Sequence, residues 1–205
     1  MQPYGIYCIE REWEQSAWTA SPPLKALAAH HGVGYCAKTG ISTGDAFLEA
    51  LSQWTTLCES FGILYISSHG FPGGITVGCD PVRDTVRLGQ MADLLESAQV
   101  DNGGCLLHFG TCSTQKLVRQ GFSDFRERTG FEAISGYRRD VDWIKSMAFD
   151  LLYLDLVIAT AIRSSDRKKH QPLDADFMET VVGELEERSW YGLGMSLGFG
   201  IENGV

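Results

Sequence analysis

The sequence lacks the features that define several classes of protein. None of its apolar stretches approaches the roughly 18 uninterrupted residues that a membrane-spanning helix needs. Basic residues are outnumbered, with 17 Lys and Arg against 26 Asp and Glu and a net charge of −9, so the field of the protein repels nucleic-acid phosphates. No GxGxxG or GxxxxGK[ST] phosphate loop follows an apolar run. We therefore expect neither a membrane nor a nucleic acid as a partner.

Cysteines are present but are not closely spaced. No CxxC or CxxxC pair marks a zinc knuckle or a redox pair among the six, which are Cys8, Cys36, Cys58, Cys79, Cys105 and Cys112. The first residues lack the basic start, apolar run and cleavage site of an export signal, so we expect a cytoplasmic location in which thiols stay reduced. Most of the six are therefore expected to be small buried side chains.

Short apolar runs alternate with helical patterns along the chain. The runs at 4–9, 33–37, 63–67, 105–109 and 131–135 predict strands, and apolar spacing of three or four predicts helices at 24–29, 47–61, 88–98, 115–128, 142–162 and 174–188. The glycine-rich tail 192–204 either adds a last strand or stays loose. A chain of 205 residues is within the size that one core can serve. These patterns predict one domain over 1–205, an α/β/α sandwich in three layers with a mainly parallel central sheet.

Two motifs fall where loops leave the carboxyl ends of predicted parallel strands, which is where sites form in such sheets. The Ser-His-Gly tripeptide containing His69 follows the run 63–67, and the Thr-Cys-Ser tripeptide containing Cys112 follows the run 105–109. Neighbouring parallel strands lie about 5 Å apart, so residues just beyond their ends can meet. We therefore predict that His69 and Cys112 lie close together.

This pair has the chemistry of a nucleophilic cysteine and its base. An unassisted thiol is mostly protonated at pH 7, and His69 can take its proton. We also expect Cys112 to open a helix, whose N-terminus would lower the pKa of the thiol. Gly70 and the amide of Cys112 are candidate oxyanion donors, because a residue without a side chain lets its N–H approach a carbonyl closely. His108 is a rival base, but on a strand it would lie roughly 13 Å from Cys112, so we interpret it as structural.

The residues around both motifs resemble the paired signature of caspase-like cysteine peptidases. Residues 63–70 read ILYISSHG, and residues 106–114 read LLHFGTCST. The Thr-Cys-Ser-Thr turn departs from the Gln-Ala-Cys-Arg-Gly of animal caspases and is more similar to the Ala-Cys-Ser-Thr turn of CHAT-type and separase-like domains. Residues 134–143, ISGYRRDVDW, are similar to the Leu-Trp-Pro-Val-Asp region of CHAT-type domains. The resemblance covers residues 62–161.

The resemblance implies a caspase-like fold and a cysteine endopeptidase that needs no metal or cofactor. In such an enzyme Cys112 would attack the peptide carbonyl, His69 would protonate the leaving amine, and Gly70 with the Cys112 amide would hold the oxyanion. CHAT-type relatives often act beside a sensor protein. We therefore expect a protein or peptide substrate and a regulatory or sensor protein as partner.

Two acidic residues are candidates for the specificity pocket of such a peptidase. A carboxylate from Asp140 or Asp142 would pair well with arginine, which predicts cleavage after Arg or Lys. Asp142 is equally suited to cap the helix that follows. Arg138 and Arg139 lie beside both aspartates, so a preference for acidic residues stays open.

Two other functions fit the same residues. The chain could be a catalytically inactive scaffold or binding module of the same fold. It could instead be another cysteine-dependent acyl-transfer enzyme, such as an acyltransferase or thioesterase, in which case its substrate pocket should be more apolar. Separately, His30 and His31 form a histidine pair at the end of a predicted helix, where the partial negative charge of the helix favours them.

Overall fold

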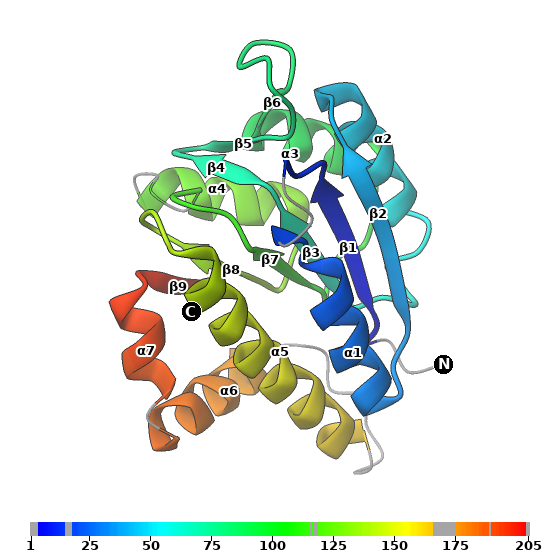
Figure 1. The fold of residues 1–205 in the computed structure, drawn as a ribbon. Helices are drawn as coiled ribbons and strands as arrows, with labels where there is room; N and C mark the ends of the chain where they lie inside the picture. The colour runs from blue at the N-terminus through cyan, green and yellow to red at the C-terminus, as the bar shows by residue number, and fades with distance from the viewer. Residues whose placement is uncertain are drawn as a thin grey trace.

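The main sheet of the protein has six strands and is mainly parallel. The computed structural model describes residues 4–14, 18–114, 116, 119–165, 175–188 and 190–203. The strands are β1 (Ile6–Arg11), β2 (Tyr35–Ile41), β3 (Ile63–Ser67), β7 (Leu106–Phe109), β8 (Ala133–Tyr137) and β9 (Phe199–Asn203). They lie in the order β2-β1-β3-β7-β8-β9, in which only β9 runs antiparallel to its neighbour (Figure 1). The predicted mainly parallel sheet is confirmed.

Helices cover both faces of this sheet. They are α1 (Ser21–His31), α2 (Gly44–Trp54), α3 (Leu88–Ser97), α4 (Arg119–Thr129), α5 (Trp143–Ser165), α6 (Ala175–Glu187) and α7 (Trp190–Ser196). One buried apolar cluster lies between the sheet and α1, α5 and α6, and a second lies between the sheet and α2, α3 and α4. In Figure 1, α1 and α5 cross the near face, and α3 and α4 lie behind the sheet. The architecture is that of an α/β sandwich.

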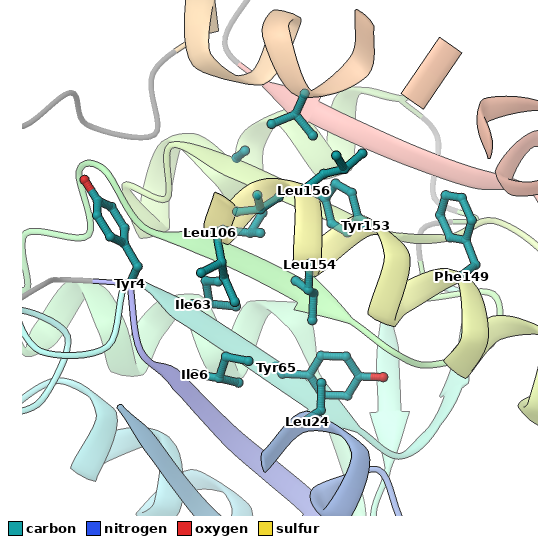
Figure 2. Close-up of a cluster of buried hydrophobic side chains, with 14 of the residues drawn as sticks. Tyr4, Ile6, Leu24, Ile63, Tyr65, Leu106, Phe149, Tyr153, Leu154 and Leu156 are labelled. Carbon is teal, nitrogen blue, oxygen red and sulfur yellow. The ribbon is translucent and has the colours of Figure 1, made fainter. Parts of the chain in front are cut away.

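The central strands read as continuous apolar runs because both of their faces are covered. Successive side chains of a strand point to opposite faces. Ile63 and Tyr65 of β3 therefore enter the cluster beneath α1 and α5 (Figure 2), while Leu64 and Ile66 enter the other cluster. Side chains of β1 and β7 divide in the same way.

A small antiparallel sheet stands beyond the carboxyl ends of the parallel strands (Figure 1). It consists of β4 (His69–Phe71), β5 (Gly74–Thr76) and β6 (Thr85–Arg87), in that order. Gly73, in the turn between β4 and β5, has a φ of 86°, a conformation that glycine adopts without strain. The first strand of this small sheet begins at His69 itself.

At the C-terminal end, the glycine-rich tail does add a strand. Residues 190–196 form α7, and β9 then pairs with β8, with Tyr137 opposite Phe199. The alternative of a loose tail is therefore wrong for the described part of the tail. Asp174 and most of the charged stretch before it lie outside the described residues.

The structure bears on two expectations from the composition, which concern membrane-spanning helices and the burial of cysteines. Among the described residues no helix combines the length and apolar character that spanning a membrane requires. All six cysteines are free thiols; Cys8, Cys58 and Cys105 are buried, Cys36 and Cys112 are partly buried, and Cys79 is exposed. The expectation that most cysteines are buried thus holds for half of them.

Candidate functional site

His69 and Cys112 line one cavity. β3 and β7 are neighbours in register, so the segments that leave their carboxyl ends lie side by side. His69 begins β4 two residues beyond β3, and Cys112 lies three residues beyond β7. The cavity has a volume of about 150 Å³ and is lined by Trp13, Trp18, Ser68, His69, Gly110, Cys112, Val141, Trp143 and Ser146. The prediction that the two motifs meet is confirmed, and their catalytic roles stay predictions.

The loop that carries Cys112 does not open a helix. The first turn of α4 begins at Arg119, seven residues later, so the expected helix N-terminus at the sulfur is wrong. A reason lies in Ser113, whose φ of 55° is left-handed and does not continue into a right-handed helix. The Cys112 Sγ instead lies against the main chain of Val141, whose N–H donates to it at 3.5 Å and whose carbonyl oxygen lies 3.7 Å from it.

The segment after β8 holds this loop in place. The Ser113 N–H donates to the carbonyl oxygen of Arg139 at 3.1 Å, and the Ser113 Oγ donates to the Asp140 Oδ1 at 2.7 Å. These two bonds fix a serine whose backbone conformation is uncommon for a residue other than glycine. Asp140 is therefore directed at the residue next to the candidate nucleophile.

Asp142 caps a helix. Its Oδ1 accepts a hydrogen bond from the Lys145 N–H at 3.1 Å, in the first turn of α5. This confirms the capping alternative for Asp142. Neither Asp140 nor Asp142 is among the residues that line the cavity, so their role in substrate specificity stays a prediction without a contact that supports it.

His69 lies against an aromatic ring and feels two charges of opposite sign. The Trp13 ring meets the His69 ring edge to face, with centroids 5.2 Å apart. Partial burial lowers the pKa of His69 below its ordinary value of 6.5, the Arg11 guanidinium lowers this pKa further, and the Glu14 carboxylate opposes both. The ring is therefore mostly neutral at pH 7, the state in which a histidine accepts a proton.

Gly70 is in tight contact with the loop that carries Cys112. A Cβ added to Gly70 would lie 1.9 Å from the Cys112 carbonyl oxygen and 2.3 Å from the Thr114 Oγ1. Glycine is thus required here by the close approach of the two segments. The role of the Gly70 and Cys112 amides as oxyanion donors stays a prediction.

His108 belongs to a buried polar network outside the cavity lining. It has no exposed surface, and its Nδ1 lies 2.8 Å from the Ser135 Oγ. Its Nε2 is 3.0 Å from the Asp150 Oδ1, within ion-pair range but without hydrogen-bond alignment. Tyr65 and Tyr137 also donate hydrogen bonds to the Asp150 carboxylate. These contacts support the structural interpretation of His108.

Sequence reasoning missed the aromatic wall of the cavity. Trp13 and Trp18 line the cavity, but the sequence around them is rich in charged residues and indicates a loop. The sequence signal for the wall was the presence of tryptophans in such a polar stretch. Glu10, at the end of β1, anchors this segment. Its buried carboxylate accepts hydrogen bonds from the Trp13 Nε1 at 3.1 Å and the Thr19 Oγ1 at 2.6 Å, and from the Ala20 N–H at the start of α1.

A second and larger cavity adjoins the first. It has a volume of about 510 Å³ and shares Trp13 with the smaller one. Its lining includes the charged residues Arg11, Glu12, Glu14 and Asp84. Trp13 therefore contributes to the walls of both the small aromatic cavity at the cysteine and the wider polar one.

Fold and site together define an α/β protein with a cysteine and a histidine gathered at the carboxyl edge of its sheet. Residues 3–165 match a family described as a family of unknown function (DUF6642), and the chain belongs to that family. The match ends where α5 ends, before α6, α7 and β9. A comparison with curated proteins finds no match. The family description assigns no activity, and nothing in these comparisons links the chain to caspase-like peptidases.

Proposed function

We propose that the protein is a cysteine endopeptidase of caspase-like fold in which Cys112 is the nucleophile and His69 the base. The observation that carries the proposal is the shared cavity, because the partly buried thiol of Cys112 and the imidazole of His69 both line it. Nucleophile, base and a cavity for the reacting group are the minimum set for thiol acyl transfer. The mainly parallel sheet with helices on both faces is compatible with the fold that the resemblance implies.

The chemistry follows from the positions of the two side chains. The Cys112 Sγ attacks the peptide carbonyl carbon as the thiol proton passes to His69, and the carbonyl oxygen becomes an oxyanion. The C–N bond then breaks, the leaving amine takes the proton from His69, and a thioester remains on Cys112. Water, deprotonated by His69, attacks that thioester and releases the carboxylic acid and the thiol.

Backbone amides are the proposed oxyanion donors. The β4–β5 hairpin has a turn of two residues, so Phe71 and Gly74 are the closing, hydrogen-bonded pair. Because the two kinds of pair alternate along an antiparallel ladder, the next pair, Gly70 and Ile75, is not hydrogen-bonded. The Gly70 N–H then points away from β5. This orientation favours its use as a donor to a substrate oxygen, together with the Cys112 amide.

The substrate preference is proposed from two conflicting features. Cleavage after Arg or Lys rests on Asp140 and Asp142, which engage Ser113 and the start of α5 instead of lining the cavity. The side chains that do line it include three tryptophans and Val141, which favour an apolar group. The apolar lining therefore supports a second candidate function, transfer or hydrolysis of an apolar acyl group by the same cysteine.

One substrate panel tests both candidates. Fluorogenic peptides with Arg, Lys, Asn, Asp, Leu or Phe before the scissile bond, and short- and medium-chain acyl thioesters, are assayed with the parent chain, Cys112→Ala and His69→Ala. Peptide turnover that both substitutions abolish supports the peptidase, and thioester turnover with no peptide cleavage supports acyl transfer. Cys79→Ala is the matched control, because Cys79 is an exposed thiol outside the small cavity and should be dispensable.

A labelling experiment distinguishes an enzyme whose substrate is missing from the panel from a catalytically inactive scaffold. Alkylation of Cys112 by iodoacetamide, followed on the intact protein by mass spectrometry, should slow in His69→Ala, because the base that forms the thiolate is gone. Equal alkylation rates in the parent chain and in His69→Ala, together with silence on every substrate, would reject the enzyme and leave the inactive scaffold.

A further inference from the structure

Two histidines and an aspartate gather at the far end of α1 from the Glu10 anchor. His30 and His31 are the last residues of α1, and Asp155 lies on α5, which packs against α1. Each offers one ligand atom, and the three atoms lie within 4.8 Å of one another. The His31 Nε2 is 2.8 Å from the Asp155 Oδ1, and the two imidazole rings have centroids 5.0 Å apart.

We propose that His30, His31 and Asp155 form a binding site for a divalent transition-metal ion such as Zn²⁺. Two imidazole nitrogens and one carboxylate oxygen suit zinc, cobalt, nickel or copper, whereas Ca²⁺ and Mg²⁺ prefer oxygen ligands alone. The site is independent of the cysteine chemistry and of the proposed function.

The observed spacing requires only small side-chain movements. Two ligands at about 2.0–2.1 Å from a tetrahedral metal lie roughly 3.4 Å apart. The metal would replace the proton that His31 and Asp155 share, and their 2.8 Å contact would open slightly. The side chain of His30 is exposed, and its ligand atom already lies within 4.8 Å of the other two, so a turn of its ring covers the remaining distance.

The local field favours a cation. His30 and His31 are the last two residues of α1, where the helix dipole gives a partial negative charge. The Asp155 carboxylate adds a full negative charge beside it, and the chain as a whole carries a net charge of −9. A bound ion would join α1 to α5, two helices that are far apart in the sequence. Three protein ligands on a partly exposed site leave one coordination position for water.

The test uses the full chain with Cys112→Ser, so that metal bound by the candidate catalytic pair does not contribute. The melting temperature is measured with increasing Zn²⁺ or Co²⁺, and in parallel with Mg²⁺ or Ca²⁺. At a metal concentration 100 times the dissociation constant, Zn²⁺ should raise the melting temperature by roughly 5–11 °C. Bound Co²⁺ should give weak visible bands without the intense near-ultraviolet band of thiolate ligation.

Three variants assign the site. Asp155→Asn keeps the shape of the side chain, and His31→Gln and His30→Gln remove one nitrogen each; every one should weaken Zn²⁺ binding at least 10–100-fold, the cost of losing even an outer partner of a metal site. His30→Gln changes an exposed side chain, so it remains informative if another variant fails to fold. Glu179→Gln, which removes an exposed carboxylate on α6, is the matched control and should leave binding unchanged.

Four results would overturn the proposal. They are the absence of a Zn²⁺-dependent shift in the Cys112→Ser chain, an equal shift with Mg²⁺, unchanged affinity when His30→Gln or Asp155→Asn is added, and a Co²⁺ spectrum dominated by thiolate ligation that Cys79→Ala abolishes.

Discussion

The backbone N–H of Val141 donates a hydrogen bond to the Sγ of Cys112 across 3.5 Å. β7 and β8 are parallel and in register, so the chain that leaves β8 passes directly beside the chain that leaves β7. The segment 139–141 thus lies beside the Cys112 Sγ, where the sequence led us to expect a helix N-terminus.

Asp140 offers the first prediction, because it anchors the residue after Cys112. Asp140→Ala should lower kcat by roughly tenfold for every substrate alike, since small displacements of a reacting group are costly. Asp140→Asn keeps an acceptor for the Ser113 Oγ and should retain most of the activity. Steady-state kinetics on the peptide panel measures both. A loss in Asp140→Asn confined to Arg and Lys substrates would instead place this carboxylate in a specificity pocket.

Asp142 is predicted to act on stability. Asp142→Ala removes the acceptor for the Lys145 N–H at the start of α5 and should cost about 1 kcal/mol of unfolding free energy. Asp142→Asn supplies an equally good cap and should cost almost nothing. Urea denaturation compares the two. If Asp142→Asn is as stable as the parent chain but cleaves Arg peptides poorly, the charge of Asp142 serves the substrate and not the helix.

The pH dependence of activity should report His69. Burial first, and the Arg11 guanidinium second, lower the pKa of His69, and a base works only in its neutral form. The midpoint of the acid limb of kcat/KM should therefore lie below pH 6.5, and kcat/KM should fall there as His69 becomes protonated. Arg11→Gln should move this limb to higher pH, because a cation that disfavours protonation is gone.

Glu14 provides the opposite change for the same measurement. Its carboxylate raises the pKa of His69, so Glu14→Gln should move the acid limb to lower pH. Limbs that move in the same direction in Arg11→Gln and Glu14→Gln, or that do not move at all, would show that another group controls the profile.

Local patterns predicted the strands and the sheet edge but not the cavity wall. The run 63–67 became β3 without change, because a strand covered on both faces needs apolar residues at every position. The proximity of His69 and Cys112 followed from the rule that the carboxyl ends of parallel strands lie at one edge of the sheet. Contacts between loops have no such periodicity, so the Ser113–Asp140 bond and the approach of Trp13 to His69 were not predictable. The left-handed Ser113 likewise left no mark in the sequence.

Gly70 should tolerate no side chain. In Gly70→Ala the new methyl group would overlap the Cys112 carbonyl oxygen, so one of the two segments must move. Overpacking of this kind costs typically 1–3 kcal/mol, and the displaced Cys112 should lose most of its activity. Gly89→Ala is the matched control, because an added Cβ in this helical glycine meets nothing within 4 Å and should be neutral or stabilising. Equal stability and activity in the two variants would contradict the close contact.

Glu10 should support both stability and the site, because it fastens the segment that carries Trp13. Glu10→Ala would leave the buried Ala20 N–H and the partly buried Trp13 Nε1 without their acceptor, and should cost roughly 3–5 kcal/mol of unfolding free energy. Trp13 would then lose its fixed position against His69, so kcat/KM should fall in the fraction that remains folded.

The control for Glu10 is its near neighbour Glu12. Glu12 is exposed, and Glu12→Ala should change stability by less than about 0.5 kcal/mol. Unfolding by urea gives the stability of each variant. Quenching of tryptophan fluorescence by acrylamide reports the summed exposure of the five tryptophans, among which Trp13 loses its hydrogen bond to Glu10. Greater quenching in Glu10→Ala than in Glu12→Ala is expected. A Glu10→Ala variant with parental stability and unchanged quenching would mean that other contacts hold the aromatic wall, and that Glu10 is not its anchor.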